Sequence, residues 1–101
     1  MDKDILRESL DSAVSEYKDY ARHDLLVSLA CSYETETGED FTVYFAVPID
    51  FLSLYLEEKE EIPVPNERIQ EWLDNEYTSE DSEFILERAM LEHKVAFYSI
   101  R

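Results

Sequence analysis

Two runs of alternating apolar residues, separated by the only glycine of the chain, constrain the fold most strongly. The first run covers 25–33 and the second covers 41–47. Every second side chain of a β-strand points to the same face, and both runs are rich in the residues that strands favour. The segment between them, "ETETGED", holds Gly38 near its centre, so the pattern predicts a β-hairpin with one buried face. That face is expected to carry Leu25, Val27, Leu29, Cys31, Tyr33, Phe41, Val43, Phe45 and Val47.

A helical period precedes and follows this hairpin. In 4–22 apolar residues recur every three or four positions, which predicts an amphipathic helix. In 51–60 the apolar residues alternate as in a strand, but the Glu- and Lys-rich continuation favours a helix with Asp50 as its N-cap. Pro63 and Pro65 then predict an extended break. The stripe of the first helix consists of Leu6, Leu10, Ala13, Val14, Tyr17 and Ala21.

The last third of the chain is expected to add two helices and a strand. Asn66 is expected to cap a short helix, and Thr78 or Ser79 is expected to cap a helix over 80–93. The segment "KVAFYSI", 94–100, is expected to form a terminal strand. The apolar positions of the short helix are Ile69, Trp72 and Leu73. On the longer helix Phe84, Ile85, Ala89 and Met90 are expected to face inwards, flanked by Leu86 and Leu91.

The element order is therefore α-β-β-α-α-α-β, without a repeat or a boundary between domains. A chain of 101 residues has the size of one domain, here 1–101. The predicted fold class is α+β, a small antiparallel sheet of about three strands covered by helices.

The charge of the chain is the main clue to its function. Nine Lys and Arg stand against 25 Asp and Glu, a formal charge of −16. A hydrophobic content of 45% and an aromatic content of 13% distinguish the chain from a disordered acidic tail. Such a surface repels nucleic acid and anionic membranes and attracts basic protein surfaces. The segment 54–83 alone has eleven carboxylates, against Lys59 and Arg68.

No catalytic or metal-binding motif accompanies this charge. His23 and His93 stand outside patterns such as H-E-x-x-H, and a single glycine excludes a glycine-rich phosphate loop. The segment 74–79 loosely resembles a calcium loop but has Ser79 where the loop needs glycine. Cys31 is expected to be a buried, inert thiol. We expect a protein that is not an enzyme and that needs no cofactor or metal.

The N-terminal residues favour a cytoplasmic protein. "MDKD" is charged and no apolar segment follows it, so a signal peptide is not expected. No apolar run has the length of a membrane span.

In size, acidity and lack of catalytic motifs, the chain resembles the small inhibitors of phages and mobile elements, the anti-CRISPR and anti-restriction DNA-mimic proteins. The stretch "YFAVPIDF", Tyr44 to Phe51, is similar to a strand-Pro-x-Asp-helix stretch of ArdA-type antirestriction proteins. The resemblance implies an acidic inhibitor that covers the basic nucleic-acid-binding surface of a defence nuclease or effector complex and does not itself bind nucleic acid.

Other classes fit the same charge. An immunity protein or antitoxin that caps a basic toxin needs the same electrostatics, and so does an acidic chaperone or adaptor without mimicry. Solubility alone is a further interpretation, although a small domain needs a net charge of only about 2–8 for it.

The predicted partner-binding surface lies on the acidic helices between 57 and 87. Neighbouring aromatic residues (Tyr55, Trp72 and Tyr77) are expected to anchor the interface. The leading candidates are Glu57, Glu58, Glu60, Glu61, Glu76, Glu80, Asp81 and Glu83. The hairpin connection supplies a second acidic patch, Glu34, Glu36, Glu39 and Asp40.

Overall fold

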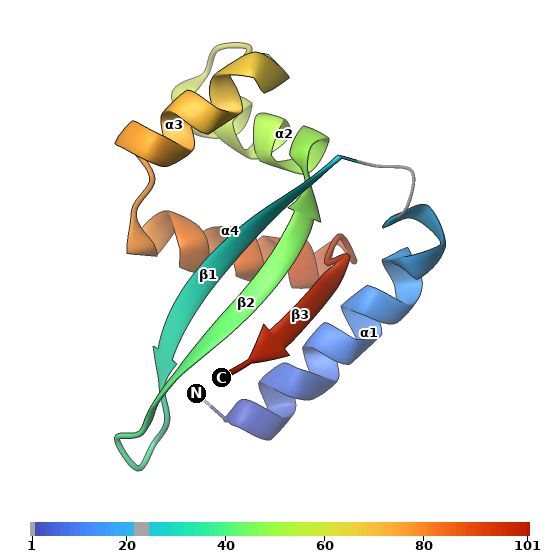
Figure 1. The fold of residues 1–101 in the computed structure, drawn as a ribbon, viewed down its shortest axis with the longest axis vertical. Helices are drawn as coiled ribbons and strands as arrows, with labels where there is room; N and C mark the ends of the chain where they lie inside the picture. Colours follow the sequence, from blue (N-terminus) through green and yellow to red (C-terminus); the bar gives the residue numbers. More distant parts are fainter. Residues whose placement is uncertain (1, 22–24) are drawn as a thin grey trace.

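The structure, a computed structural model, describes residues 2–21 and 25–101, without the side chains of 18–21. Its central element is a three-stranded antiparallel sheet (Figure 1). Strand β1 (Leu26–Glu34) pairs with β2 (Asp40–Pro48), which also pairs with β3 (Phe97–Ile100). The predicted hairpin is confirmed, and its connection turns at Gly38, whose φ of 85° favours glycine.

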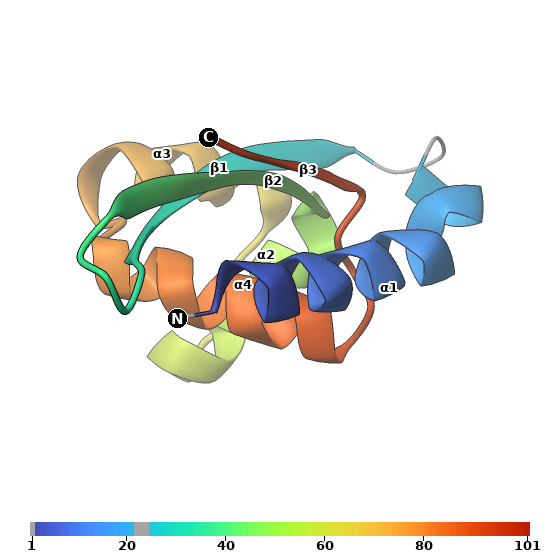
Figure 2. The same cartoon turned by 90° about the horizontal axis from the view of Figure 1, so that it is seen from below.

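Four helices accompany the sheet in the predicted order, so the α+β prediction is confirmed. They are α1 (Lys3–Ala21), α2 (Ile49–Glu60), α3 (Ile69–Asn75) and α4 (Ser79–Leu91), with a 3-10 turn at Asn66–Arg68 before α3. Helices α1 and α4 lie side by side under one face of the sheet, as Figure 2 shows. Within the described ranges, no helix has both the length and the apolar character that crossing a membrane requires.

The core lies between the hairpin and these two helices. The alternating residues of β1 and β2 face α1 and α4, as their period predicts, and most are buried. From α1 the stripe Leu6, Leu10, Ala13 and Tyr17 is buried, and Val14 is half-buried. Leu25 precedes β1 and is exposed, contrary to its predicted place on the buried face. Arg22 and His23 lie outside the described residues, as does the side chain of Ala21.

The inward face of α4 differs from the prediction. Ser82, Ile85, Leu86 and Ala89 are buried, whereas Phe84 is 51% exposed. Positions 82, 85, 86 and 89 form one stripe of a helix. Because successive helical residues are about 100° apart, Phe84 is turned away from the sheet when Ile85 points at it. Met90 is half-buried and packs against the core, so it faces inwards as predicted.

Two predicted caps are wrong and one is confirmed. Helix α2 begins directly after β2, with Pro48 at the N-cap position, so Asp50 lies in the first turn and accepts a hydrogen bond from the Asn66 side chain at 2.9 Å. Asn66 begins the 3-10 turn instead of capping a helix, and Pro65 precedes it. Thr78 does cap α4, which runs over Ser79–Leu91. The predicted strand 94–100 is shorter in the structure: β3 begins at Phe97, and the Ala96 N–H just before it donates to the Ala46 carbonyl at 2.8 Å.

Candidate partner-binding groove

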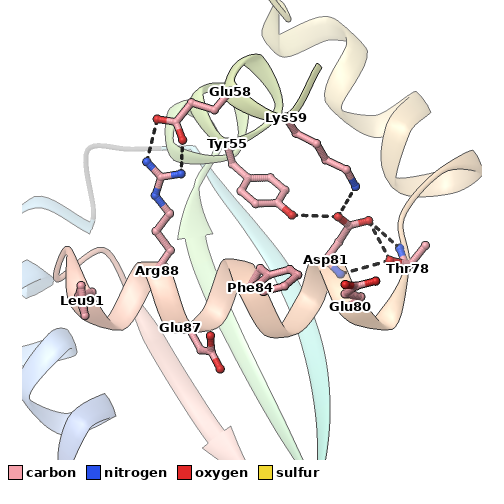
Figure 3. A pocket seen from close by; sticks show the side chains of 10 residues that line it. All are labelled: Tyr55, Glu58, Lys59, Thr78, Glu80, Asp81, Phe84, Glu87, Arg88 and Leu91. Atoms are coloured by element: carbon pink, nitrogen blue, oxygen red, sulfur yellow. Dashed lines mark hydrogen bonds and ion pairs between the residues drawn. The ribbon is translucent and has the colours of Figure 1, made fainter. Parts of the chain in front are cut away.

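A groove of about 740 Å³ lies between α2 and α4 (Figure 3). Most of its lining comes from α4, whose exposed side carries both charged and apolar residues. The lining residues are Tyr55, Glu58, Lys59, Thr78, Glu80, Asp81, Phe84, Glu87, Arg88 and Leu91.

Asp81 holds one end of this groove together. Its side chain is only 3% exposed, and Figure 3 shows two groups of α2 converging on it. Its Oδ1 accepts hydrogen bonds from the Lys59 ammonium at 2.5 Å and from the Tyr55 hydroxyl at 2.9 Å. Its Oδ2 accepts from the Thr78 backbone N–H at 3.1 Å, while the Thr78 hydroxyl accepts from the Asp81 N–H at 3.2 Å. This reciprocal pair is a capping box, so one carboxylate both starts α4 and joins it to α2.

These bonds determine the ionisation of Asp81. Burial raises the pKa of the carboxyl, but the bonds from Lys59, Tyr55 and Thr78 outweigh burial and hold that pKa below its usual value. The pKa of the Tyr55 hydroxyl is raised, first by burial and then by its bond to Asp81. Asp81 is therefore a charged structural group at neutral pH.

Arg88 joins the two helices at the other end of the groove. Its guanidinium donates to both carboxylate oxygens of Glu58, with Nη2 2.8 Å from Oε1, and Nε donates to Glu92 at 2.9 Å. The two carboxylates raise the pKa of Arg88, and the bonds from Arg88 lower the pKa of Glu58. A planar two-bond pair of this kind fixes geometry as well as charge.

Helix α4 presents apolar side chains to solvent, one between these two connections and one beyond Arg88. Phe84 lies between Asp81 and Arg88 along the groove, and Leu91 follows two turns later with 81% of its surface exposed. Glu80 and Glu87 are the acidic members of the same helix side, and Glu87 points away from α2 in Figure 3. None of the ion pairs between described residues includes either glutamate.

The structure separates the predicted site residues. Glu58, Glu80 and Asp81 line the groove, but Asp81 is buried and bonded, so its prediction as an exposed contact is wrong. Two glutamates of α2 are half-buried and do not line the groove, Glu57 and Glu60. The exposed ones outside it are Glu61, Glu76 and Glu83.

Of the predicted aromatic anchors, one lines the groove and another is buried in the core. Trp72 is buried in the core, with its ring 6.3 Å from that of Tyr55 and 5.4 Å from that of Tyr77. It therefore cannot anchor a partner, although Tyr55 does line the groove. Sequence reasoning did not include Phe84, Glu87, Arg88 and Leu91 in the site. The spacing of Phe84 and Leu91, seven residues apart, was the signal that could have found these two.

The second acidic patch is exposed at the far end of the hairpin (Figure 1). It comprises Glu34, Glu36, Glu39 and Asp40. The nine residues of β2 lead from this patch directly to α2, a distance of about 30 Å for an extended strand. The patch therefore lies at the opposite end of β2 from α2.

Two further features are distinct from the groove. A second hollow lies on the open face of the sheet, and none of the residues that line it is acidic. Cys31 is buried as predicted, and burial raises the pKa of its thiol.

Among the residues that the structure describes, no group of three His, Cys, Asp or Glu side chains is placed to hold a metal ion.

No protein-family model, curated protein or solved structure matches this chain. Its function is therefore inferred from its own fold and surface chemistry.

Proposed function

We propose that this protein is an acidic inhibitor that binds the basic nucleic-acid-binding surface of a defence nuclease complex and excludes nucleic acid from it. One observation carries the proposal: carboxylates are exposed on all four helices and the hairpin, while much of the positive charge is used within the molecule. Lys59 and Arg88 are in ion pairs. The other engaged cations lie over aromatic rings: Lys3 over Phe41, Lys94 over Tyr17 and Arg101 over Tyr44.

The spacing of charge on α4 supports mimicry of a phosphate backbone. Glu80, Glu83 and Glu87 are exposed at intervals of three and four residues. Neighbours at these intervals have Cβ atoms about 5–6 Å apart. This is of the same order as the axial spacing of phosphates in one DNA strand, about 3.4 Å. A Lys/Arg channel built for a strand therefore finds charges of similar density on this helix.

The test is capture followed by competition. The tagged protein is incubated with a nuclease-treated bacterial lysate that contains defence complexes, and retained proteins are identified by mass spectrometry. A basic nucleic-acid-binding protein should be retained, and added duplex DNA should displace it because both ligands occupy one surface. If DNA leaves the complex intact, inhibition by mimicry is refuted.

A second candidate function is that of an immunity protein or antitoxin that caps a basic toxin. The exposed Phe84 and Leu91 favour it, because a pure charge mimic has no use for apolar side chains in its contact surface. In that case the captured partner is a toxin whose activity falls on binding, and DNA does not compete.

A further inference from the structure

The exposed side of α4 repeats acidic and apolar residues with a helical period. Glu80, Phe84, Glu87 and Leu91 are separated by four, three and four residues, so they share one side of the helix. Single exposed apolar residues are ordinary on a protein surface. Here Phe84 and Leu91 line the same groove, and the core is built from a different stripe of α4. This side of the helix is therefore available for a function other than folding.

The wall opposite these residues is preformed. Tyr55 and Lys59 of α2 are bonded to Asp81 at one end, and Glu58 is bonded to Arg88 at the other. The two bridges fix the separation of α2 and α4 along the groove (Figure 3). They also occupy both cations of the lining, so Glu80 and Glu87 dominate its outward charge. A preformed groove binds without the cost of ordering its walls.

The dimensions and the charge define the occupant. From Glu80 to Leu91 the helix advances about 16 Å, or three turns. A groove between two helices presents side chains rather than the free backbone groups of a sheet edge, which favours an amphipathic helix over an added strand. Glu80 and Glu87 lie about 10 Å apart along the axis of α4. They therefore match two cations that are two turns apart on a partner helix. Nucleic acid and a second copy of this acidic chain are both repelled.

We infer that the groove between α2 and α4 binds a basic amphipathic helix of the partner protein, with apolar residues on Phe84 and Leu91 and Lys or Arg beside Glu80 and Glu87. The inference rests on the proposed function only for its basic protein partner, which the toxin-capping candidate shares. Beyond the proposed function, it specifies that the partner binds through a helix and that groove residues of α4 recognise this helix.

Two synthetic peptides of one composition test this inference. Each has about 14 residues, or four helical turns, made of Leu, Lys and Gln with a fluorescent label. In the striped peptide the leucines share one helical face, and in the scrambled peptide they are distributed around the helix. Binding is measured by fluorescence anisotropy at about 0.15 M salt, where surface charges are partly screened.

Three forms of the protein are compared with the striped peptide. The double variant Phe84→Ser, Leu91→Ser removes the apolar contacts. The matched control, Leu54→Ser, changes a leucine of α2 that is 60% exposed and does not line the groove. We expect the striped peptide to bind the unchanged protein and the Leu54→Ser control at least tenfold more tightly than the scrambled peptide. The double variant should lose this preference, because a tenfold change corresponds to about 1.4 kcal/mol and removal of a buried anchor costs at least that.

The outcomes separate the two proposals. If both peptides bind equally and the double variant behaves like the control, the helix-binding groove is refuted and charge-driven binding remains. If neither peptide binds the unchanged protein, its acidic surface does not attract basic segments, and the proposed function fails with the inference. Circular dichroism of each variant establishes that the fold is retained.

Discussion

Replacing Asp81 with Asn tests whether one buried carboxylate joins α2 to α4. The side chain accepts from Lys59 and Tyr55 through one oxygen and from Thr78 through the other. Asn has the same size but carries an NH2 group in place of one oxygen. In one orientation this NH2 faces Lys59 and Tyr55, and in the other it faces the Thr78 N–H. Either orientation leaves a donor without an acceptor.

The expected loss of unfolding free energy follows from these contacts. A hydrogen bond to a charged group contributes about 1.5–3 kcal/mol, and a helix N-cap contributes about 1 kcal/mol. The Lys59 side chain is 48% exposed, so water screens its share of the attraction. We therefore expect Asp81→Asn to cost about 2–3 kcal/mol. For a domain of this size that lowers Tm by about 8–24 °C.

Urea unfolding followed by fluorescence of the buried Trp72 measures this loss. The control is Glu80→Gln, which removes an exposed carboxylate from the same helical turn and should change stability by less than about 0.5 kcal/mol. Equal effects of the two substitutions would show that Asp81 does not join the helices as described.

The pH dependence of the unfolding free energy, compared between the unchanged protein and Asp81→Asn, gives a second test. The pKa of Asp81 is below its usual value in the folded protein and returns to about 3.9 on unfolding. Its stabilisation is therefore complete above that pH and is lost as pH falls through the folded pKa. The difference between the unchanged protein and Asp81→Asn should be constant above about pH 5 and should shrink below about pH 4. A difference that grows on acidification contradicts the assignment.

Three further predictions concern the turn and the surface charge. Gly38→Ala should lower the unfolding free energy, measured by urea unfolding, by about 1–2 kcal/mol because φ is positive at this position. Gly38→Asn should lower it less, because Asn tolerates a positive φ better than Ala. Equal losses for the two variants would point to a steric cause. Adding salt should raise the unfolding free energy of this protein, because screening weakens repulsion among its carboxylates; a fall in urea-unfolding midpoint would contradict that. Replacing Glu80, Glu83 and Glu87 with Lys should abolish partner capture without loss of the circular dichroism signal, whereas reversing the hairpin patch should leave capture intact; the opposite result would move the site to the hairpin.

The sheet and the first helix could be predicted because one regular period dominates each of their sequences. In β1 and β2 the apolar residues occupy alternate positions, and in α1 Leu6, Leu10, Ala13 and Tyr17 form one stripe. Helix α4 contains two overlapping stripes, one through Ile85 and Leu86 and another through Phe84 and Leu91. Both are apolar, so the sequence alone does not decide which one faces the sheet. The groove exists because the first stripe is buried and the second remains outside.

The role of Asp81 was predictable only in part. The spacing of Thr78 and Asp81 is that of a capping box, and the cap itself was predicted. The contacts to Tyr55 and Lys59 cross 26 and 22 residues of sequence. They depend on how α2 and α4 are placed against the sheet, which no local pattern encodes. A carboxylate in an acidic segment was therefore assigned to the surface although it lies inside.

The association rate at different ionic strengths shows whether the acidic surface of this protein recruits a basic partner. The captured partner is immobilised, and association and dissociation are followed from about 0.05 to 0.5 M salt, a range over which screening becomes strong. Electrostatic steering predicts an association rate that falls at least about tenfold, with a smaller change in the dissociation rate. An association rate that does not change with salt would mean that the charge of this protein does not recruit its partner.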